Sequence, residues 1–172
     1  MMKQFAAFVG VAALALSGPA LAQAPNDAQI AHIAYTAGQI DVAAARQALE
    51  RSHNAEVRAF AETMVRDHEV VNRQAVALVT RLHVTPAANP TSAALSSQAE
   101  ATLHRLAGLS GAAYDRAYVE NEVAYHRIVN GALHDTLIPA AQNAELKTLL
   151  ESGLALFTEH QTHAEHLASQ LR

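Results

Sequence analysis

Apolar residues recur every three or four positions along most of the chain, which is the spacing of one face of an α-helix. No segment alternates apolar and polar residues in the way that a half-buried strand does. The spacing predicts four long helices and one shorter helix, at residues 27–51, 55–83, 92–107, 112–136 and 143–171. The pattern therefore predicts an all-α protein.

The breaks between these segments carry residues that begin or end helices. Asn26-Asp27 is a capping pair, residues 85–90 contain two prolines, and Pro139 is expected to end the fourth segment. Each long helix has one apolar face to bury, so we expect a four-helix bundle of the ferritin-like type. The short helix at 92–107 joins the second and third long helices. Its length would let those two run parallel, and an up-down-up-down bundle with a capping helix is the alternative.

The first 22 residues predict a secretory signal peptide. Lys3 precedes an apolar run at residues 5–16, and Ala20-Leu21-Ala22 is a small-x-small cleavage site. The run is too short to span about 30 Å of hydrocarbon. We expect export, to the periplasm where the cell has two membranes, and a mature chain without a transmembrane segment. Residues 23–172 then form a single helical-bundle domain.

Composition limits the kinds of site and partner that the chain can have. The chain has no cysteine, which excludes disulfides and cysteine-ligated metal sites. Its formal net charge of −4 argues against a nucleic-acid partner. Ten histidines are unusual for this length and direct attention to metal chemistry.

Ionisable side chains interrupt the apolar faces of all four long segments. They are Asp41, His68, Glu122, His126 and His160. Their burial without partners would be strongly unfavourable, and counting residues along each helix places all five near mid-bundle. Three imidazoles and two carboxylates at one depth predict a site for one transition-metal ion, Zn, Fe or Cu.

Three further residues are expected to support this site from outside the ligand set. Tyr118 precedes Glu122 by one turn and would bond a ligating carboxylate; packing in the core with a solvated hydroxyl is the alternative. Asp115 lies on the same face as Tyr118. Asp67 adjoins a core histidine but points about 100° away from it, so it would reach the site only if the helix is rotated.

Two other interpretations stay open. A buried layer of histidine–carboxylate hydrogen bonds could fix the helix register without metal. The protein would then be a non-catalytic structural or interaction protein of the cell envelope. A metal-dependent oxidase is the enzymatic alternative and is less expected, because di-iron bundles use four carboxylates and paired Glu-x-x-His motifs. Here the spacing is Glu122-x-x-x-His126.

Two motifs carry a resemblance to a known family. They are Met64-Val65-Arg66-Asp67-His68 and Leu109-Ser110-Gly111-Ala112-Ala113-Tyr114-Asp115-Arg116-Ala117-Tyr118-Val119, followed by His126 and His160. Together, residues 27–168 resemble the bacterial domain-of-unknown-function family 4142. The resemblance implies an exported, ferritin-like helical protein but no activity. It matches to family positions the residues Asp67, His68, Tyr114, Asp115, Tyr118, His126 and His160. Asp41 stands where the family commonly has Glu, and Tyr114 where it commonly has Phe.

Overall fold

The computed structural model describes residues 24–171, and within that range the chain forms helices and no strand. The all-α prediction is therefore confirmed, whereas the predicted signal peptide at residues 1–22 lies outside the described residues. The long helices are α1 (Asp27–Arg51), α2 (Ala55–Arg81), α4 (Gly111–Ala132) and α6 (Ala144–Gln170), and the shorter one is α3 (Pro90–Ala107).

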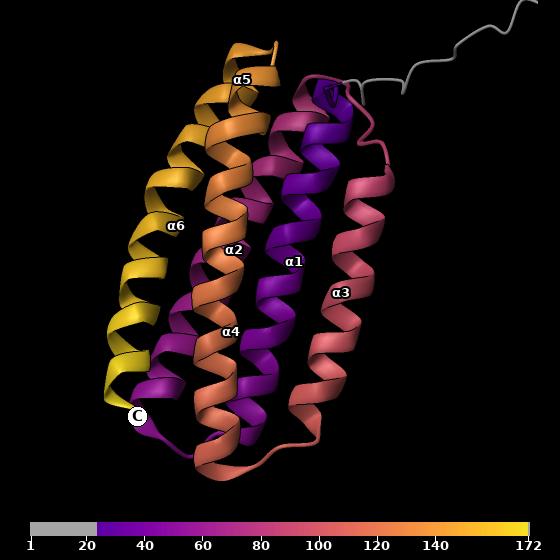
Figure 1. Ribbon diagram of the computed structural model, residues 1–172. Helices are drawn as coiled ribbons and strands as arrows, with labels where there is room; N and C mark the ends of the chain where they lie inside the picture. Colours follow the sequence, from indigo (N-terminus) through magenta and orange to yellow (C-terminus); the bar gives the residue numbers. More distant parts are fainter. Residues whose placement is uncertain (1–23, 172) are drawn as a thin grey trace, which may run out of the picture.

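The four long helices lie side by side, and α3 runs along the outside of α1 (Figure 1). In that view α1, α3 and α6 descend while α2 and α4 ascend. Hydrogen bonds tie the upper ends together: Ala87 N–H donates to the Ala28 carbonyl (2.9 Å), and the Asp27 carboxylate accepts from the backbone N–H groups of Gln142 and Asn143 (both 2.8 Å). The second and third long helices thus run parallel, because α3 returns the chain to the opposite end.

Asparagine side chains fix where three of the long helices begin. Asn26 caps α1 as predicted, and it does so in a reciprocal capping box with Gln29 rather than as a pair with Asp27. Asn54 and Asn143 accept hydrogen bonds from the first-turn N–H groups of α2 and α6. These side chains satisfy donors that have no partner within the helix.

Several predicted boundaries differ from the structure, and α3 begins at Pro90 instead of residue 92. Helix α2 ends at Arg81 instead of residue 83, because His83 adopts a left-handed conformation with φ 54°. Pro139 does not end the helical segment after α4. A π-helical turn, η1 (Leu133–Leu137), follows α4 and leads into the short helix α5 (Ile138–Ala140). Pro139 lies in the first turn of α5, where a missing N–H is tolerated.

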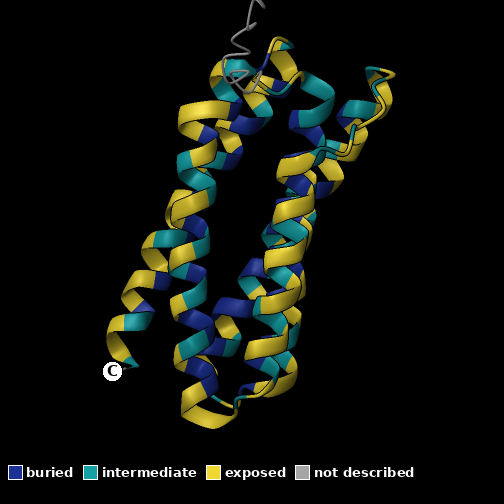
Figure 2. Ribbon diagram, turned by 45° about the vertical axis from the view of Figure 1, so that its right-hand side comes forward, coloured by how far each residue is buried: buried dark blue, intermediate teal, exposed yellow. Residues whose placement is uncertain are grey.

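Two apolar clusters fill the interior, one toward each end of the helices. The lower cluster includes Phe60 and Met64, and the upper cluster includes Ile30, Leu146 and Leu150. Buried positions lie on the helix sides that face one another (Figure 2). Each fully buried large apolar side chain contributes roughly 1.5–3 kcal/mol. Between the two clusters lies a layer of buried polar residues, which is where the candidate site is found.

No helix in residues 24–171 combines the length and the hydropathy that a membrane span requires.

Candidate metal centre

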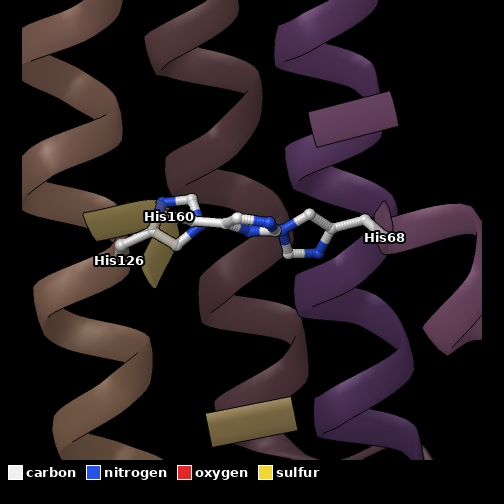
Figure 3. A group of neighbouring side chains, drawn as sticks. All are labelled: His68, His126 and His160. Atoms are coloured by element: carbon white, nitrogen blue, oxygen red, sulfur yellow. The ribbon is translucent and has the colours of Figure 1, made fainter. Parts of the chain in front are cut away.

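The five predicted ligands converge in the polar layer between the two apolar clusters. Asp41 comes from α1, His68 from α2, Glu122 and His126 from α4, and His160 from α6. All five are buried, with at most 4% of each residue exposed. The three histidines point toward one another from three helices (Figure 3).

Distances divide the five residues into two overlapping groups. The imidazole rings of His68, His126 and His160 have centroids 5.3–5.7 Å apart, and one nitrogen of each lies within 4.8 Å of the others. Ligand atoms of Asp41, Glu122 and His126 lie within 4.8 Å of one another as well. His126 belongs to both groups, so α4 supplies the residue around which the site is built.

Asp41 joins the two groups. Its Oδ2 atom lies 3.4 Å from His68 Nε2 and 3.5 Å from His126 Nε2. These separations exceed those of ordinary hydrogen bonds, and none of the three atoms has a hydrogen-bond partner in the described chain. Two ligands of a tetrahedral ion with bonds of about 2.0–2.1 Å lie roughly 3.4 Å apart. The spacing is therefore compatible with two ligands of one ion.

Hydrogen bonds on their outer sides fix the tautomers of two histidines. His126 Nδ1 donates to the Glu122 carbonyl (3.0 Å), since a carbonyl only accepts. His160 Nε2 donates to Asp67 Oδ2 (3.1 Å). A lone pair is left on His126 Nε2 and on His160 Nδ1, both buried and without a partner. Metal-bound histidines commonly hold their second ring nitrogen in this way.

Burial keeps the imidazoles neutral. It lowers the pKa of His68 to about 2 and that of His126 to about 4, with repulsion among the histidines adding to the effect, and it also lowers the pKa of His160. Neutral imidazole is the form that binds metal. All three residues can therefore donate a nitrogen lone pair at neutral pH.

The pKa values of the two buried carboxyl groups of the site, Asp41 and Glu122, rise, whereas those of the histidines fall. Burial raises the pKa of Asp41 to about 8, and burial together with the charge of Asp41 raises the pKa of Glu122 well above its ordinary value. A nearby cation would reverse this desolvation penalty. Glu122 Oε2 lies 3.8 Å from His126 Nδ1, on the side of the ring away from Asp41's contact at Nε2.

Of the three residues predicted to support the site, Asp67, Asp115 and Tyr118, only Asp67 forms a hydrogen bond to a candidate ligand. Asp67 reaches the site through His160 of α6, although its neighbour in the sequence is His68. Burial raises the pKa of Asp67, but hydrogen bonds from Arg66 and His160 outweigh that effect and lower it. Asp67 is thus an ionised acceptor that orients His160.

Tyr118 and Asp115 make no hydrogen bond to the five candidate ligands. The Tyr118 ring is fully buried, lies parallel to the Tyr114 ring at 6.3 Å and meets Phe60 edge-on at 6.2 Å. Its hydroxyl has no partner in the described chain, and neither does Asp115 Oδ1. The structure therefore places Tyr118 in the lower apolar cluster.

Three neighbours of the site were not predicted. Phe157 stacks on His68 with ring centroids 4.5 Å apart and planes 9° apart. Asn72 is buried one turn after His68, and the Tyr125 hydroxyl donates to the Ala37 carbonyl (2.9 Å). The i, i+4 spacing of His68 and Asn72 was a signal for the latter. Nothing in the spacing distinguishes Phe157 from an ordinary core residue.

Residues 12–167 match a family model described as "Domain of unknown function (DUF4142)". The chain belongs to the DUF4142 family. Comparisons with curated proteins and with solved structures give no match. The match confirms the family membership that the motifs Met64–His68 and Leu109–Val119 predicted. The DUF4142 description names no activity, so the role of this chain must be argued from its site.

Within this DUF4142 chain, the Met64–His68 motif supplies two adjacent contacts. His68 faces Asp41 on α1, and Asp67 bonds His160 on α6. One turn of α2 therefore connects both neighbouring helices to the polar layer.

Proposed function

We propose that this chain is an exported, ferritin-like protein that binds one transition-metal ion, Zn, Fe or Cu, and serves in metal handling. Its candidate ligands are the five buried residues Asp41, His68, Glu122, His126 and His160, which form two groups that share His126. The ferritin-like assignment is supported by the parallel course of α2 and α4, joined by a connection that crosses the length of the molecule (Figure 1). Periplasmic localisation is supported by the signal-peptide pattern in residues 1–22.

The observation that carries this proposal is the position of Asp41 Oδ2, which lies 3.4 and 3.5 Å from two unpartnered imidazole nitrogens. A hydrogen-bonded layer would shorten these contacts to about 2.7–3.0 Å. Imidazole suits zinc, copper and iron, and one carboxylate offsets part of the ion's charge. Glu122 remains as a second buried carboxyl group that can balance the rest.

Metal content tests the proposal directly. Untagged protein isolated from the periplasm should carry one ion per chain in native mass spectrometry. His160→Ala removes one ligand and its link to Asp67, so this variant should lose most of the bound metal. His166→Ala is the matched control, since His166 is exposed on the same helix and its ring contacts only Gln170 among the described hydrogen bonds. Metal-free parent protein, or equal loss in both variants, would contradict the assignment.

Export leads to a separate prediction. Intact mass of the protein in the periplasmic fraction should correspond to a chain beginning at Gln23 or Pro25, because the cleavage motif ends at Ala22 with Ala24 as the second candidate. A variant that lacks residues 2–22 should remain in the cytoplasm. A soluble periplasmic species that retains Met1 would contradict signal-peptide cleavage.

A further inference from the structure

A cavity of about 300 Å³ lies in the upper half of the molecule, above the histidine layer. Its walls come from all four long helices, α3 and η1, and are largely apolar, including Ile33, Val71, Leu133, Leu150 and Phe157. Natural protein interiors contain few voids larger than a water molecule. An engineered apolar cavity of about 150 Å³ stays dry and binds benzene. The cavity is thus large enough for an organic ligand.

One buried polar residue lies in the wall of this apolar space, between it and a surface hollow that the residue also borders. Asn72 lines the cavity and is only 5% exposed, and its Nδ2 atom has no hydrogen-bond partner in the described chain. Gly38 of α1 makes room for it, because a Cβ atom there would collide with Asn72 Oδ1. A buried donor without an acceptor is unfavourable, so a ligand that supplies the acceptor would relieve that penalty.

The edge of the cavity reaches the surface beside α3. Leu95 and Ile128 border the cavity and also a smaller hollow of about 140 Å³. Ile128 is 64% exposed, the most exposed large hydrophobic residue described. Apolar surface at the rim of an apolar cavity gives a hydrophobic molecule a route of entry.

We propose that this cavity binds a neutral, apolar small molecule with one carbonyl group, which accepts a hydrogen bond from Asn72 Nδ2. No charged side chain lines the cavity, so a charged head group would lack a partner there. Scaling from benzene in a cavity of half the volume gives a ligand of roughly twelve non-hydrogen atoms.

This site is distinct from the proposed metal site. Phe157 separates the two, with its ring stacked on His68 and also bordering the cavity. The inference therefore goes beyond the proposed function and does not depend on a bound ion.

Displacement of the fluorescent reporter 1-naphthylamine, which is no larger than the expected ligand, by 2-undecanone tests the proposal on the full mature chain. The matched hydrocarbon is 2-methylundecane, which has the same size and no acceptor. The parent protein should bind the ketone roughly 3–10-fold more tightly, the ratio expected of one neutral hydrogen bond. Absence of displacement, or equal affinity for ketone and hydrocarbon, would overturn the proposal without any variant.

Variants locate the contact. Asn72→Leu should bind both compounds with equal affinity, because it keeps the volume and removes the donor. Thr136→Val is the matched control, since Thr136 is another polar residue at the cavity, and it should keep the preference for the ketone. Circular dichroism establishes that each variant is folded. A ketone preference that survives Asn72→Leu would overturn the role of Asn72.

Repeating the titration after chelator treatment separates this inference from the metal proposal. The ketone affinity should be unchanged, because no metal ligand lines the cavity. Loss of ketone binding on chelation would overturn the independence of the two sites.

Discussion

Zinc should raise the melting temperature of chelator-treated protein by roughly 5–10 °C when the free ion exceeds its Kd a hundredfold. An ion that binds only the folded state adds about 2.7 kcal/mol at that excess. For a domain of about 150 residues, each kcal/mol raises the melting temperature by roughly 2–4 °C. Differential scanning calorimetry of untagged protein, with and without zinc, measures the shift. Iron(II) and copper(II) should be compared in the same way.

Variants decide whether the stabilisation arises in the polar layer. His126→Ala removes the residue shared by both groups of ligands and should abolish the shift, whereas the exposed control His166→Ala should respond like the parent. An equal response from both variants would disprove the ligand assignment. If none of the three metals shifts the parent protein, the metal-free polar layer is the correct interpretation, and a role in binding an envelope partner becomes the leading hypothesis.

The helices were predictable because their signals are local. The 3–4 spacing of apolar residues gave α1 its observed bounds, and Asn26 supplied the cap that was expected of it. Pro139 misled the prediction because its usual effect is also local. A proline ends a helix when its missing N–H removes a needed backbone hydrogen bond. The π-helical turn η1 precedes Pro139 and places it in the first turn of α5, where that bond is not needed.

The convergence of the five candidate residues was predictable to the extent that burial follows from helical spacing. Asp41 and His68 were expected at one depth because rise per residue is constant, and the structure brings them to 3.4 Å. The hydrogen-bond partners of the supporting residues were less predictable. Asp67 bonds a histidine on another helix, and Tyr118 bonds no carboxylate, because both outcomes depend on helix rotation. The cavity beside Asn72 is the space that six helical segments leave unfilled, so it cannot be predicted from any one of them.

The metal-free protein should lose stability as the pH rises from 7 to 8, and zinc should remove much of that loss. Burial raises the pKa of Asp41 from 3.8 to about 8. The folded chain therefore keeps a proton that the unfolded chain has released. The stability associated with neutral Asp41 is complete below pH 3.8 and is lost as the pH rises through the folded-state pKa. The slope is about 1.4 kcal/mol per pH unit for each carboxyl group that stays protonated.

The histidines change the stability in the opposite direction, and they do so at lower pH. Because burial lowers the pKa of His68 to about 2 and that of His126 to about 4, their contribution is present above pH 6.5 and is lost as the pH falls below it. Above pH 7 most imidazoles are neutral in both the folded and the unfolded chain. Asp41 and Glu122 therefore set the slope in the measured range.

Zinc changes this slope because it must displace the proton of Asp41. The stabilisation by zinc should therefore grow by about 1.4 kcal/mol per pH unit until Asp41 is ionised. Urea unfolding at pH 7.0, 7.5 and 8.0, with and without zinc, measures both trends. Asp41→Asn should reduce the pH slope of the metal-free protein's unfolding free energy by about 1.4 kcal/mol per pH unit, the contribution of one carboxyl group. It should also remove the pH dependence of any stabilisation by zinc that remains. Asp135→Asn alters a carboxylate with a 73% exposed side chain and should change neither. A zinc effect that is constant with pH in the parent would show that Asp41 is not a ligand.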